Sequence, residues 1–377
     1  MAGIYIHIPF CKQACHYCDF HFSTSLKNKD AFLISLKKEI ELQKNYLEAS
    51  KISTIYFGGG TPSLLSESEL MHIFDTLNSH FEIAPDAEIT LEANPDDLSL
   101  KKIKELKHTP VNRLSVGIQS FFDEDLVLMN RAHTSKEALS VVQTSQDAGF
   151  ENITIDLIYG IQTLTNEKWK HNLQTAFDLQ VKHISSYCLT VEAKTALSNF
   201  IKTGKVKNVD EQQSIEQFEI MVEKMKENDF IHYEISNFCK KDYHSKHNSN
   251  YWLKENYLGL GPSAHSYNGI SRQWNISNNA LYIQSLENNK LNFEEETLTA
   301  AQKYNEYILT SLRTIWGTDL NCIKTIFGTD YLTYCIKESE KYISEGKLLN
   351  QENKLFLTEK GKLLADKIAS DLFYISD

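Results

Sequence analysis

The sequence lacks an apolar run long enough to cross a membrane, which takes about 20 consecutive residues in a helix. Met1 is followed almost at once by strand-like sequence, without the basic, apolar and small-residue regions of a signal peptide. We therefore expect a cytoplasmic protein with no membrane segment of its own.

An excess of positive charge is also missing. The 377 residues include 39 Lys and Arg against 50 Asp and Glu, which gives a formal net charge of -11 and a pI near 5.7. Such a chain repels polyphosphate, so we expect no nucleic-acid partner, and any anionic ligand must be met by locally placed cations. No long low-complexity tract occurs, and hydrophobic and charged contents of 41% and 24% are those of an ordinary globular protein.

Outside one cluster near the start of the chain, the sequence has no two cysteines close together. Three of the seven cysteines stand together with the spacing C-x3-C-x2-C, and long stretches isolate the rest. An odd number with one cluster indicates a reducing compartment, where thiols serve metals rather than disulfides. The clustered residues are Cys11, Cys15 and Cys18, and the isolated ones are Cys188, Cys239, Cys322 and Cys335.

The cysteine triplet directly follows the apolar run from Gly3 to Phe10. Three thiolates on one short loop can hold three irons of a cubane cluster and leave the fourth iron open to a small molecule. A tetrahedral zinc site that uses His16 or His21 is the alternative, although zinc loops usually pair two C-x2-C units. The spacing favours the cluster and leaves the zinc site open.

Up to about residue 191, short β-branched runs alternate with amphipathic helical segments in six strand-helix units. These runs are almost continuously apolar, as is typical of parallel strands that helices cover on both faces. The predicted strands are Ile4 to Ile8, Thr54 to Phe57, Glu88 to Glu92, Arg113 to Ile118, Asn152 to Leu157 and His183 to Thr190. The predicted helices include Asp30 to Leu47, Glu67 to Phe81, Lys136 to Ala148 and Glu167 to Leu179, the second with a capping box formed by Ser66 and Glu69. We predict an α/β fold with a partial (β/α)6 barrel, an open doubly wound sheet being the alternative.

The regular alternation ends near residue 192. Residues 192–294 hold one long amphipathic helix, Val209 to Asn228, and then site-building loops rich in aromatics, glycines and histidines. Residues 295–377 predict a small helical, winged-helix-like module with helices at Ala300 to Thr314 and Asp319 to Phe327. A hairpin at Lys347 to Leu357 and a helix from Lys360 complete it. In an acidic chain this module favours packing or interaction over nucleic-acid reading. We therefore predict that the chain divides into a barrel (1–191), a barrel extension (192–294) and the C-terminal module (295–377).

Polar residues and glycines gather where the predicted parallel strands end. The run from Gly58 to Pro62 lets the backbone approach a ligand closely, and no Gly-Lys-Ser/Thr follows to make it a phosphate loop. The polar residues are Glu92, Asn94, Gln119, Arg131 and Asp156. As a ring at successive strand ends they suit a zwitterionic, hydroxyl-bearing ligand, because carboxylates bind amines, hydroxyls or a sulfonium and arginine binds a carboxylate.

Together, the cysteine loop and the Gly-Gly-Gly-Thr-Pro run resemble the radical S-adenosylmethionine superfamily. The segments Tyr5 to Phe10, Leu91 to Pro95, Ser115 to Phe121 and Arg131 to His133 are similar to its oxygen-independent coproporphyrinogen III oxidase branch. This resemblance implies a [4Fe-4S] cluster on Cys11, Cys15 and Cys18, with the amine and carboxylate of S-adenosylmethionine on the fourth iron. It also implies that the cofactor is surrounded by Tyr5, Tyr17, Gly59, Gly60, Thr61, Glu92, Gln119, Arg131, Asp156 and Cys188.

Two departures from the oxidases point to the related HemW-type haem chaperones. Phe20 stands where the oxidases carry an additional cysteine, and Cys11 lies almost at the start, without their N-terminal extension. The pattern H-N-x-x-Y-W at His247, Asn248, Tyr251 and Trp252 resembles a motif associated with haem in that group. It offers an imidazole for iron and two aromatic faces for a macrocycle. His265 is a second candidate ligand, and the cations available to propionates are Lys240, Lys241, Lys246 and Arg272.

The sequence therefore predicts a haem chaperone that carries a [4Fe-4S] cluster, S-adenosylmethionine and haem, and transfers haem to an acceptor protein, which can itself be membrane-associated. A reductant protein such as flavodoxin or ferredoxin is the other expected partner. The alternative is an oxygen-independent coproporphyrinogen III oxidase, which converts two propionates to vinyl groups by radical decarboxylation. A barrel with structural zinc and an unrelated substrate is a third candidate.

Overall fold

Six parallel strands lie side by side in chain order at the centre of one large sheet in the computed structural model, which describes residues 1–48 and 50–375. They are β1 (Ala2–Ile8), β2 (Ile52–Gly59), β3 (Ile83–Ala93), β4 (Arg113–Gln119), β5 (Asn152–Tyr159) and β6 (His183–Cys188). All six predicted strands are confirmed, although the last ends at Cys188 and not at Thr190. Their apolar side chains are buried on both faces, as expected for strands that helices cover.

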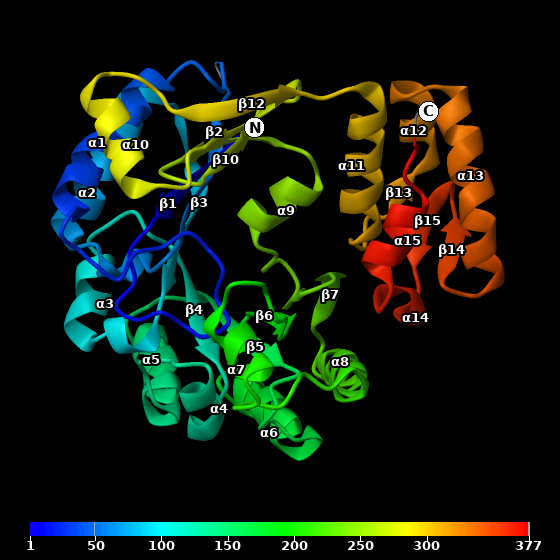
Figure 1. The fold of residues 1–377 in the computed structure, drawn as a ribbon, viewed down its shortest axis with the longest axis horizontal. Coiled ribbons are helices and arrows are strands. Elements are labelled where there is room, and N and C mark those ends of the chain that lie inside the picture. The colour runs from blue at the N-terminus through cyan, green and yellow to red at the C-terminus, as the bar shows by residue number, and fades with distance from the viewer. Residues whose placement is uncertain (49, 376–377) are drawn as a thin grey trace.

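The helices between these strands lie on the outer side of the curved sheet (Figure 1). They are α1 (Lys29–Leu42), α2 (Glu67–His80), α3 (Leu100–Leu106), α4 (Asp123–Leu128), α5 (Ser135–Asp147) and α6 (Asn166–Asp178), with 3-10 turns η1 (Pro62–Leu64) and η2 (Pro95–Asp97). The predicted capping box begins α2, where the Ser66 side chain accepts from the Glu69 amide and Glu69 accepts from the Ser66 amide at 2.7 Å. The first helix ends at Leu42, before the predicted Leu47.

The region from residue 192 onward extends this sheet at both edges, so the expectation of loops there was wrong. Strands β8 (Asn237–Cys239) and β7 (Ile231–Glu234) continue it beyond β6. On the other side β9 (Asn256–Leu260) pairs in parallel with β1, followed by β10 (His265–Tyr267), β11 (Ser271–Asn275) and β12 (Phe293–Thr297). These strands have only three to five residues, too few for a recognisable alternation. The helices here are α7 (Ala196–Lys202), α8 (Glu211–Glu227), α9 (Lys246–Trp252) and α10 (Asn279–Glu287).

Helix α9 lies between the two extended edges of the sheet (Figure 1). Its first two backbone amides, of Lys246 and His247, donate to the Glu88 carboxylate in β3 at 3.1 and 3.0 Å. This anion at a helix start satisfies amides that have no partner within the helix. The helix is thereby fixed next to Thr54, near the amino ends of the strands, whereas the cysteine loop follows the carboxyl end of β1.

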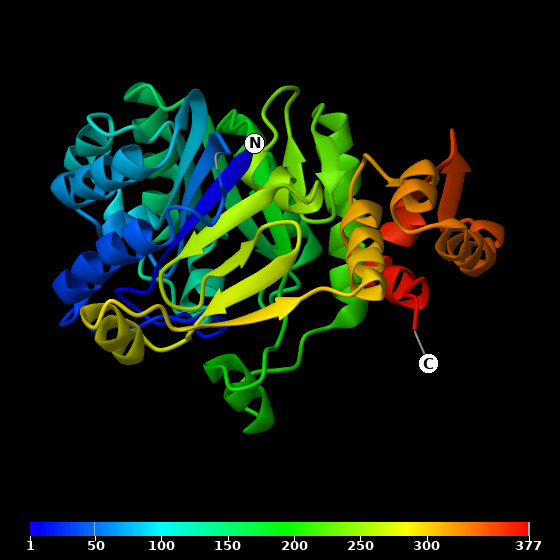
Figure 2. The same ribbon diagram turned by 90° about the horizontal axis from the view of Figure 1, so that it is seen from above.

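The C-terminal residues have a hydrophobic core of their own, which contains Tyr304, Ile308, Ile323 and Leu355. The helices are α11 (Ala300–Leu312), α12 (Leu320–Ile326), α13 (Thr329–Ser344), α14 (Glu359–Lys362) and α15 (Ala365–Asp371). A small sheet in the order β13 (Thr318–Asp319), β15 (Lys354–Leu357), β14 (Leu348–Gln351) completes the module, visible as the orange and red part of Figures 1 and 2. The predicted hairpin is confirmed, and α13 was not anticipated. In the described part of the chain, no helix combines the length and the apolarity needed to span a membrane.

One buried carboxylate joins α1 to the added strands. Glu39 is 1% exposed and accepts hydrogen bonds from Gly261 N at 2.7 Å, Tyr282 Oη at 2.6 Å and Asn275 Nδ2 at 2.5 Å. Burial raises the pKa of Glu39 to about 7, although these donors lower it. Three donors from three separate segments therefore depend on one side chain.

Replacing Glu39 by alanine should lower the free energy of unfolding by about 2–4 kcal/mol, because it leaves buried donors without an acceptor. Urea unfolding followed by circular dichroism measures this loss. Glu41→Ala, at an exposed position on the same helix, is the matched control and should stay within about 0.5 kcal/mol of the parent. An equal effect of the two substitutions would show that the Glu39 hydrogen bonds contribute little.

Candidate functional site

The cysteine loop is held in place by backbone hydrogen bonds within itself and to two other parts of the chain. Cys11 N donates to Ser23 O at 3.0 Å, which closes the loop on itself. His16 N donates to Met129 O at 3.1 Å, and Leu197 N of α7 donates to His16 O at 2.8 Å. Figure 2 shows α7 as the green helix that projects from the body of the molecule. The three cysteines form no disulfide with any described residue, and each is partly exposed.

The nearby histidines are engaged elsewhere. His16 Nδ1 is hydrogen-bonded to Leu128 O at 2.9 Å, and His21 Nε2 to Asn279 Oδ1 at 2.7 Å. Within residues 1–48 and 50–375, no three His, Cys, Asp or Glu side chains converge on a point that could hold a single metal ion. The spacing of the three cysteines still favours a cluster over a zinc site.

The glycine run after β2 packs directly against the cysteine loop. Gly60 N donates to Ile8 O at 2.9 Å, and a Cβ on Gly60 would lie 2.6 Å from Phe10 O. No side chain fits there, so glycine is required for the close approach. Gly59 has φ of +102° and donates its amide to Glu92 Oε2 at 3.2 Å.

Thr61 connects this run to both the cysteine loop and the third strand. Its buried hydroxyl accepts from Asn94 Nδ2 at 3.2 Å and is hydrogen-bonded to the Cys11 thiol. Burial raises the pKa of Cys11 to about 11, against the lowering effect of Thr61. The Cys11 thiol is therefore protonated at neutral pH when it holds no metal.

Two half-buried carboxylates face the interior of the barrel. Glu92 accepts from Tyr56 Oη at 2.8 Å, and burial, with the charge of Asp156 adding to it, raises the pKa of Glu92 to about 7. Burial likewise raises the pKa of Asp156 to about 6. Neither forms a salt bridge with any described residue. Tyr5 stacks on Tyr56 with ring centroids 6.2 Å apart, so an aromatic wall lies beside these acids. Desolvated carboxylates without a cation suit a positively charged ligand.

Arg131 is the cation of the site. Its Nη2 donates to Asn94 Oδ1 and Gly117 O, both at 2.6 Å, and its Nη1 to Cys15 Sγ at 3.4 Å. Its Nε is buried and has no hydrogen-bond partner among the described residues. A buried guanidinium NH without a partner fits an additional anionic acceptor.

The remaining expected residues of this group are Tyr17, in the cysteine loop, and Gln119, at the end of β4. Tyr17 is close to Arg131, Cys15 and Asp156, and burial raises its pKa well above the ordinary value. Gln119 ends β4 with φ of 69°, a left-handed conformation that is uncommon for a residue with a side chain. Tyr56, which holds Glu92, was missed from the sequence, although it shares the alternating pattern of the strand that ends in the glycine run.

Cys188 does not join this group. Register pairs Asp156 with Ser185 and Tyr159 with Cys188, and alternation turns Cys188 to the opposite face from Asp156. Its thiol is hydrogen-bonded to Ser214 of α8, on the helix-covered side. Any contact of Cys188 with the cofactor would therefore come from its backbone and not from its thiol.

The imidazole of His247 is not free. Only 2% exposed, it is hydrogen-bonded through Nδ1 to Thr54 Oγ1 and through Nε2 to Tyr251 Oη, each at 2.9 Å. Its ring stacks on Tyr56 at 5.0 Å, and burial lowers its pKa to about 3, so it is neutral. In this structure His247 is a core residue at the amino ends of the strands.

The rest of the H-N-x-x-Y-W motif does not surround one open space. Tyr251 packs edge-on against Tyr257 at 4.7 Å, whereas Trp252 lies under the guanidinium of Arg313, 5.4 Å away. The amide of Asn248 is bound by the cap residue Ser245. Of the cations expected to receive propionates, Lys240 is bound to Asn228 O and Arg272 to Glu306. The arrangement therefore differs from the expected haem pocket around His247.

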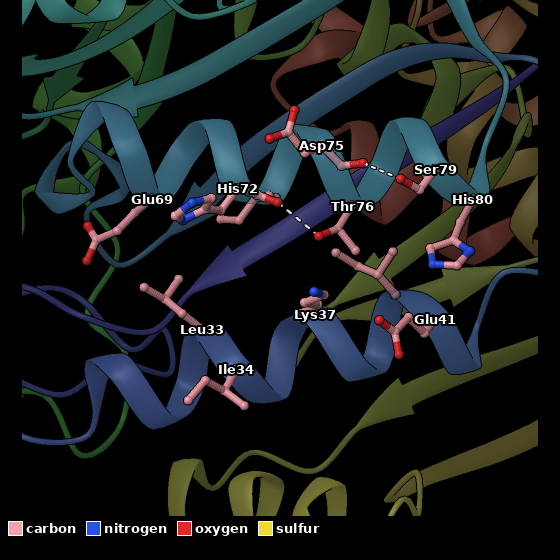
Figure 3. Close-up of a pocket in the computed structure, with 12 residues that line it drawn as sticks. Leu33, Ile34, Lys37, Glu41, Glu69, His72, Asp75, Thr76, Ser79 and His80 are labelled. Atoms are coloured by element: carbon pink, nitrogen blue, oxygen red, sulfur yellow. Dashed lines mark hydrogen bonds between the residues drawn. The ribbon is translucent and has the colours of Figure 1, made fainter.

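A separate groove lies on the outer side of the barrel between α1 and α2 (Figure 3). It is lined by Ile34, Lys37, Asp75 and His80, among others, and contains none of the residues expected to hold a cofactor. This groove is therefore no part of the site.

Comparison with known proteins agrees with this geometry. Residues 5–176 match the radical SAM superfamily, and residues 298–364 match the HemN C-terminal domain. The chain is 34% identical over 371 residues to "Heme chaperone HemW" of Bacillus subtilis, with 98% of both chains covered. It is 32% identical over 365 residues to the protein of the same name from Lactococcus lactis, with 97% of this chain and 95% of that chain covered.

A solved structure shares the fold. The coproporphyrinogen III oxidase HemN of Escherichia coli, titled a radical SAM enzyme, superimposes with a TM-score of 0.86 over 99% of this chain and 90% of that chain. At 22% sequence identity this likeness shows the fold alone. It confirms the predicted barrel and its C-terminal module.

Anaerobic reconstitution with iron and sulfide should give a brown protein with about four of each per chain. Cys15→Ala removes one of three thiols and should lose most of both, as measured by metal and sulfide analysis and by the visible spectrum. Cys322→Ala, which removes an isolated thiol in α12, is the control and should keep them. A colourless parent protein that holds only zinc would contradict the cluster.

Proposed function

The chain belongs to the HemW family of the radical SAM superfamily, and on this premise we propose that it is a haem chaperone, which binds haem and transfers it to an acceptor protein. The observation that carries the proposal is its similarity over nearly its whole length to relatives named heme chaperone HemW. The likeness to the oxidase HemN supports a common fold and no particular reaction.

The radical SAM family implies a [4Fe-4S] cluster and S-adenosylmethionine, and the site fits both groups. The three thiols of Cys11, Cys15 and Cys18 would hold three irons. When bound, the cluster supplies the electron that activates S-adenosylmethionine. Thr61 is hydrogen-bonded to the Cys11 thiol, and Gly60 keeps the loop close to β2.

The side chains around this loop offer a matching group for each charge of S-adenosylmethionine. Arg131, with its free Nε, would receive a carboxylate. Glu92 and Asp156 would face the sulfonium or the ribose hydroxyls. The stacked rings of Tyr5 and Tyr56 and the buried Tyr17 would exclude water from the cofactor.

We also infer a cytoplasmic location and a small reductant protein, such as flavodoxin or ferredoxin, as electron donor. All seven cysteines are free thiols, which supports a reducing compartment. The acceptor would take haem from the protein surface, whether the acceptor itself is soluble or attached to a membrane.

The affinity for S-adenosylmethionine should increase by up to about tenfold between pH 6 and pH 8, because a cation binds the ionised form of Glu92, whose pKa is about 7. Binding of the cation in turn favours ionisation, so protons are released when the cofactor binds below pH 7. Isothermal titration calorimetry of the anaerobically reconstituted protein measures both effects.

Glu92→Gln should flatten this pH dependence, leaving the smaller part that Asp156 contributes. Glu82→Gln removes a carboxylate that is 73% exposed and pairs with Lys51 at the surface, and should behave as the parent. An identical pH profile in the parent and in Glu92→Gln would show that Glu92 does not face the cofactor's positive charge.

The chaperone and the oxidase give opposite results with their own ligands. The protein should bind about one haem per chain in a titration followed at the Soret band. Incubation with coproporphyrinogen III, S-adenosylmethionine and a reductant should yield no protoporphyrinogen beyond a control without protein. Repeated turnover of coproporphyrinogen, or absence of haem binding, would contradict the proposed function.

A further inference from the structure

A cavity of about 620 Å³ lies beside the cysteine loop. One wall is the end of that loop, Asp19 to Phe22, and the opposite wall is formed by β9, β10 and the turn between them. Tyr5 of β1 lies between the two walls. The cavity is therefore next to the cysteine loop, and Glu92, Gln119 and Asp156 are not among the residues that line it.

Three histidines line this cavity, and they differ in what their rings can still bind. His7 is hydrogen-bonded at both nitrogens, to Tyr5 Oη at 3.1 Å and His21 O at 2.8 Å. His21 is bound at Nε2 by Asn279. His265 is exposed, and neither of its ring nitrogens has a hydrogen-bond partner among the described residues.

The His265 ring has a fixed direction although it is exposed. It stacks on Trp274 of β11, with centroids 6.2 Å apart and planes at 26°. Desolvation, followed by the charge of Arg272, lowers the pKa of His265, which favours the neutral imidazole. A neutral, oriented and unpartnered imidazole is the form that binds iron.

Aromatic rings line the rest of the cavity. Phe20, from the cysteine loop, is 68% exposed and lies across from Tyr257 and Tyr251. A phenyl ring this exposed suits an apolar ligand that covers it. A porphyrin macrocycle presents a flat apolar face of this kind.

A cation lies on the same face of the β10–β11 ribbon. Register pairs His265 with Trp274 and Tyr267 with Arg272, so the four side chains share one face. Arg272 binds Glu306 at 3.1 Å, and its buried Nε has no partner among the described residues. This NH can donate to one propionate, while the open side of the cavity leaves the other in water.

We propose that this cavity is the haem site, with His265 as the axial ligand of the iron and Phe20 against one face of the macrocycle. The inference rests on the proposed function, because it places the ligand of a haem chaperone. It assigns His247 to the barrel core, where both nitrogens are already bound.

Haem titration with the full-length chain tests the ligand. His265→Ala should lower the affinity at least tenfold and shift the Soret and visible bands of bound haem, and added imidazole should restore the parent spectrum. His72→Ala, which removes an exposed histidine from α2, should change neither property. His265→Ala with the parent's affinity and spectrum would overturn the assignment, whereas a parent chain without haem binding would instead overturn the proposed function.

The macrocycle contact is tested separately. Phe20→Ser should weaken haem binding about tenfold and leave the iron and sulfide content of the reconstituted protein unchanged. Ile34→Ser removes a similarly exposed apolar side chain, 65% exposed on α1, and is the matched control. Equal haem affinity in Phe20→Ser and Ile34→Ser would show that the cavity next to the cysteine loop is not where haem binds.

Discussion

The close backbone contact between Gly60 and the cysteine loop is the constraint on which the site depends. Gly60 N binds Ile8 O, and the space beside its Cα is filled by the carbonyls of Ile8 and Phe10. This contact brings the end of β2 against the loop after β1, and Thr61 then reaches Cys11. Because parallel strands end at one edge, Glu92, Gln119 and Asp156 follow at successive positions around the same loop. Any side chain at residue 60 would push the thiols away from that ring.

The two ends of the barrel have different tasks in this account. At the carboxyl ends, the thiols, the two carboxylates and Arg131 have polar groups directed toward a ligand. At the amino ends, Glu88 holds α9 by its first amides, and His247 fills the interior beside Thr54. The proposed haem cavity lies between the cysteine loop and the strands added to β1, and Tyr5 and Tyr251 also line it.

The sequence predicted the six parallel strands well, because strands buried on both faces are continuous apolar runs such as Arg113 to Ile118. It did not predict the edge strands β8 and β10, since three residues carry no periodic pattern. The strand-end rule gathered Glu92, Gln119 and Asp156 correctly into one region. The position of His247 could not be predicted from the sequence. The contact that fixes α9 joins Glu88 to residues that follow it by 158 and 159 positions, and such a contact leaves no local pattern.

Haem bound beside the cysteine loop, at His265, is distinguished from haem bound at His247 by a structure of the haem-loaded protein determined under anaerobic conditions. We expect haem density between Phe20 and β10, with the iron bonded to the His265 imidazole and His247 still paired with Thr54 and Tyr251. Haem bonded to His247, with α9 displaced from Glu88, would contradict this expectation.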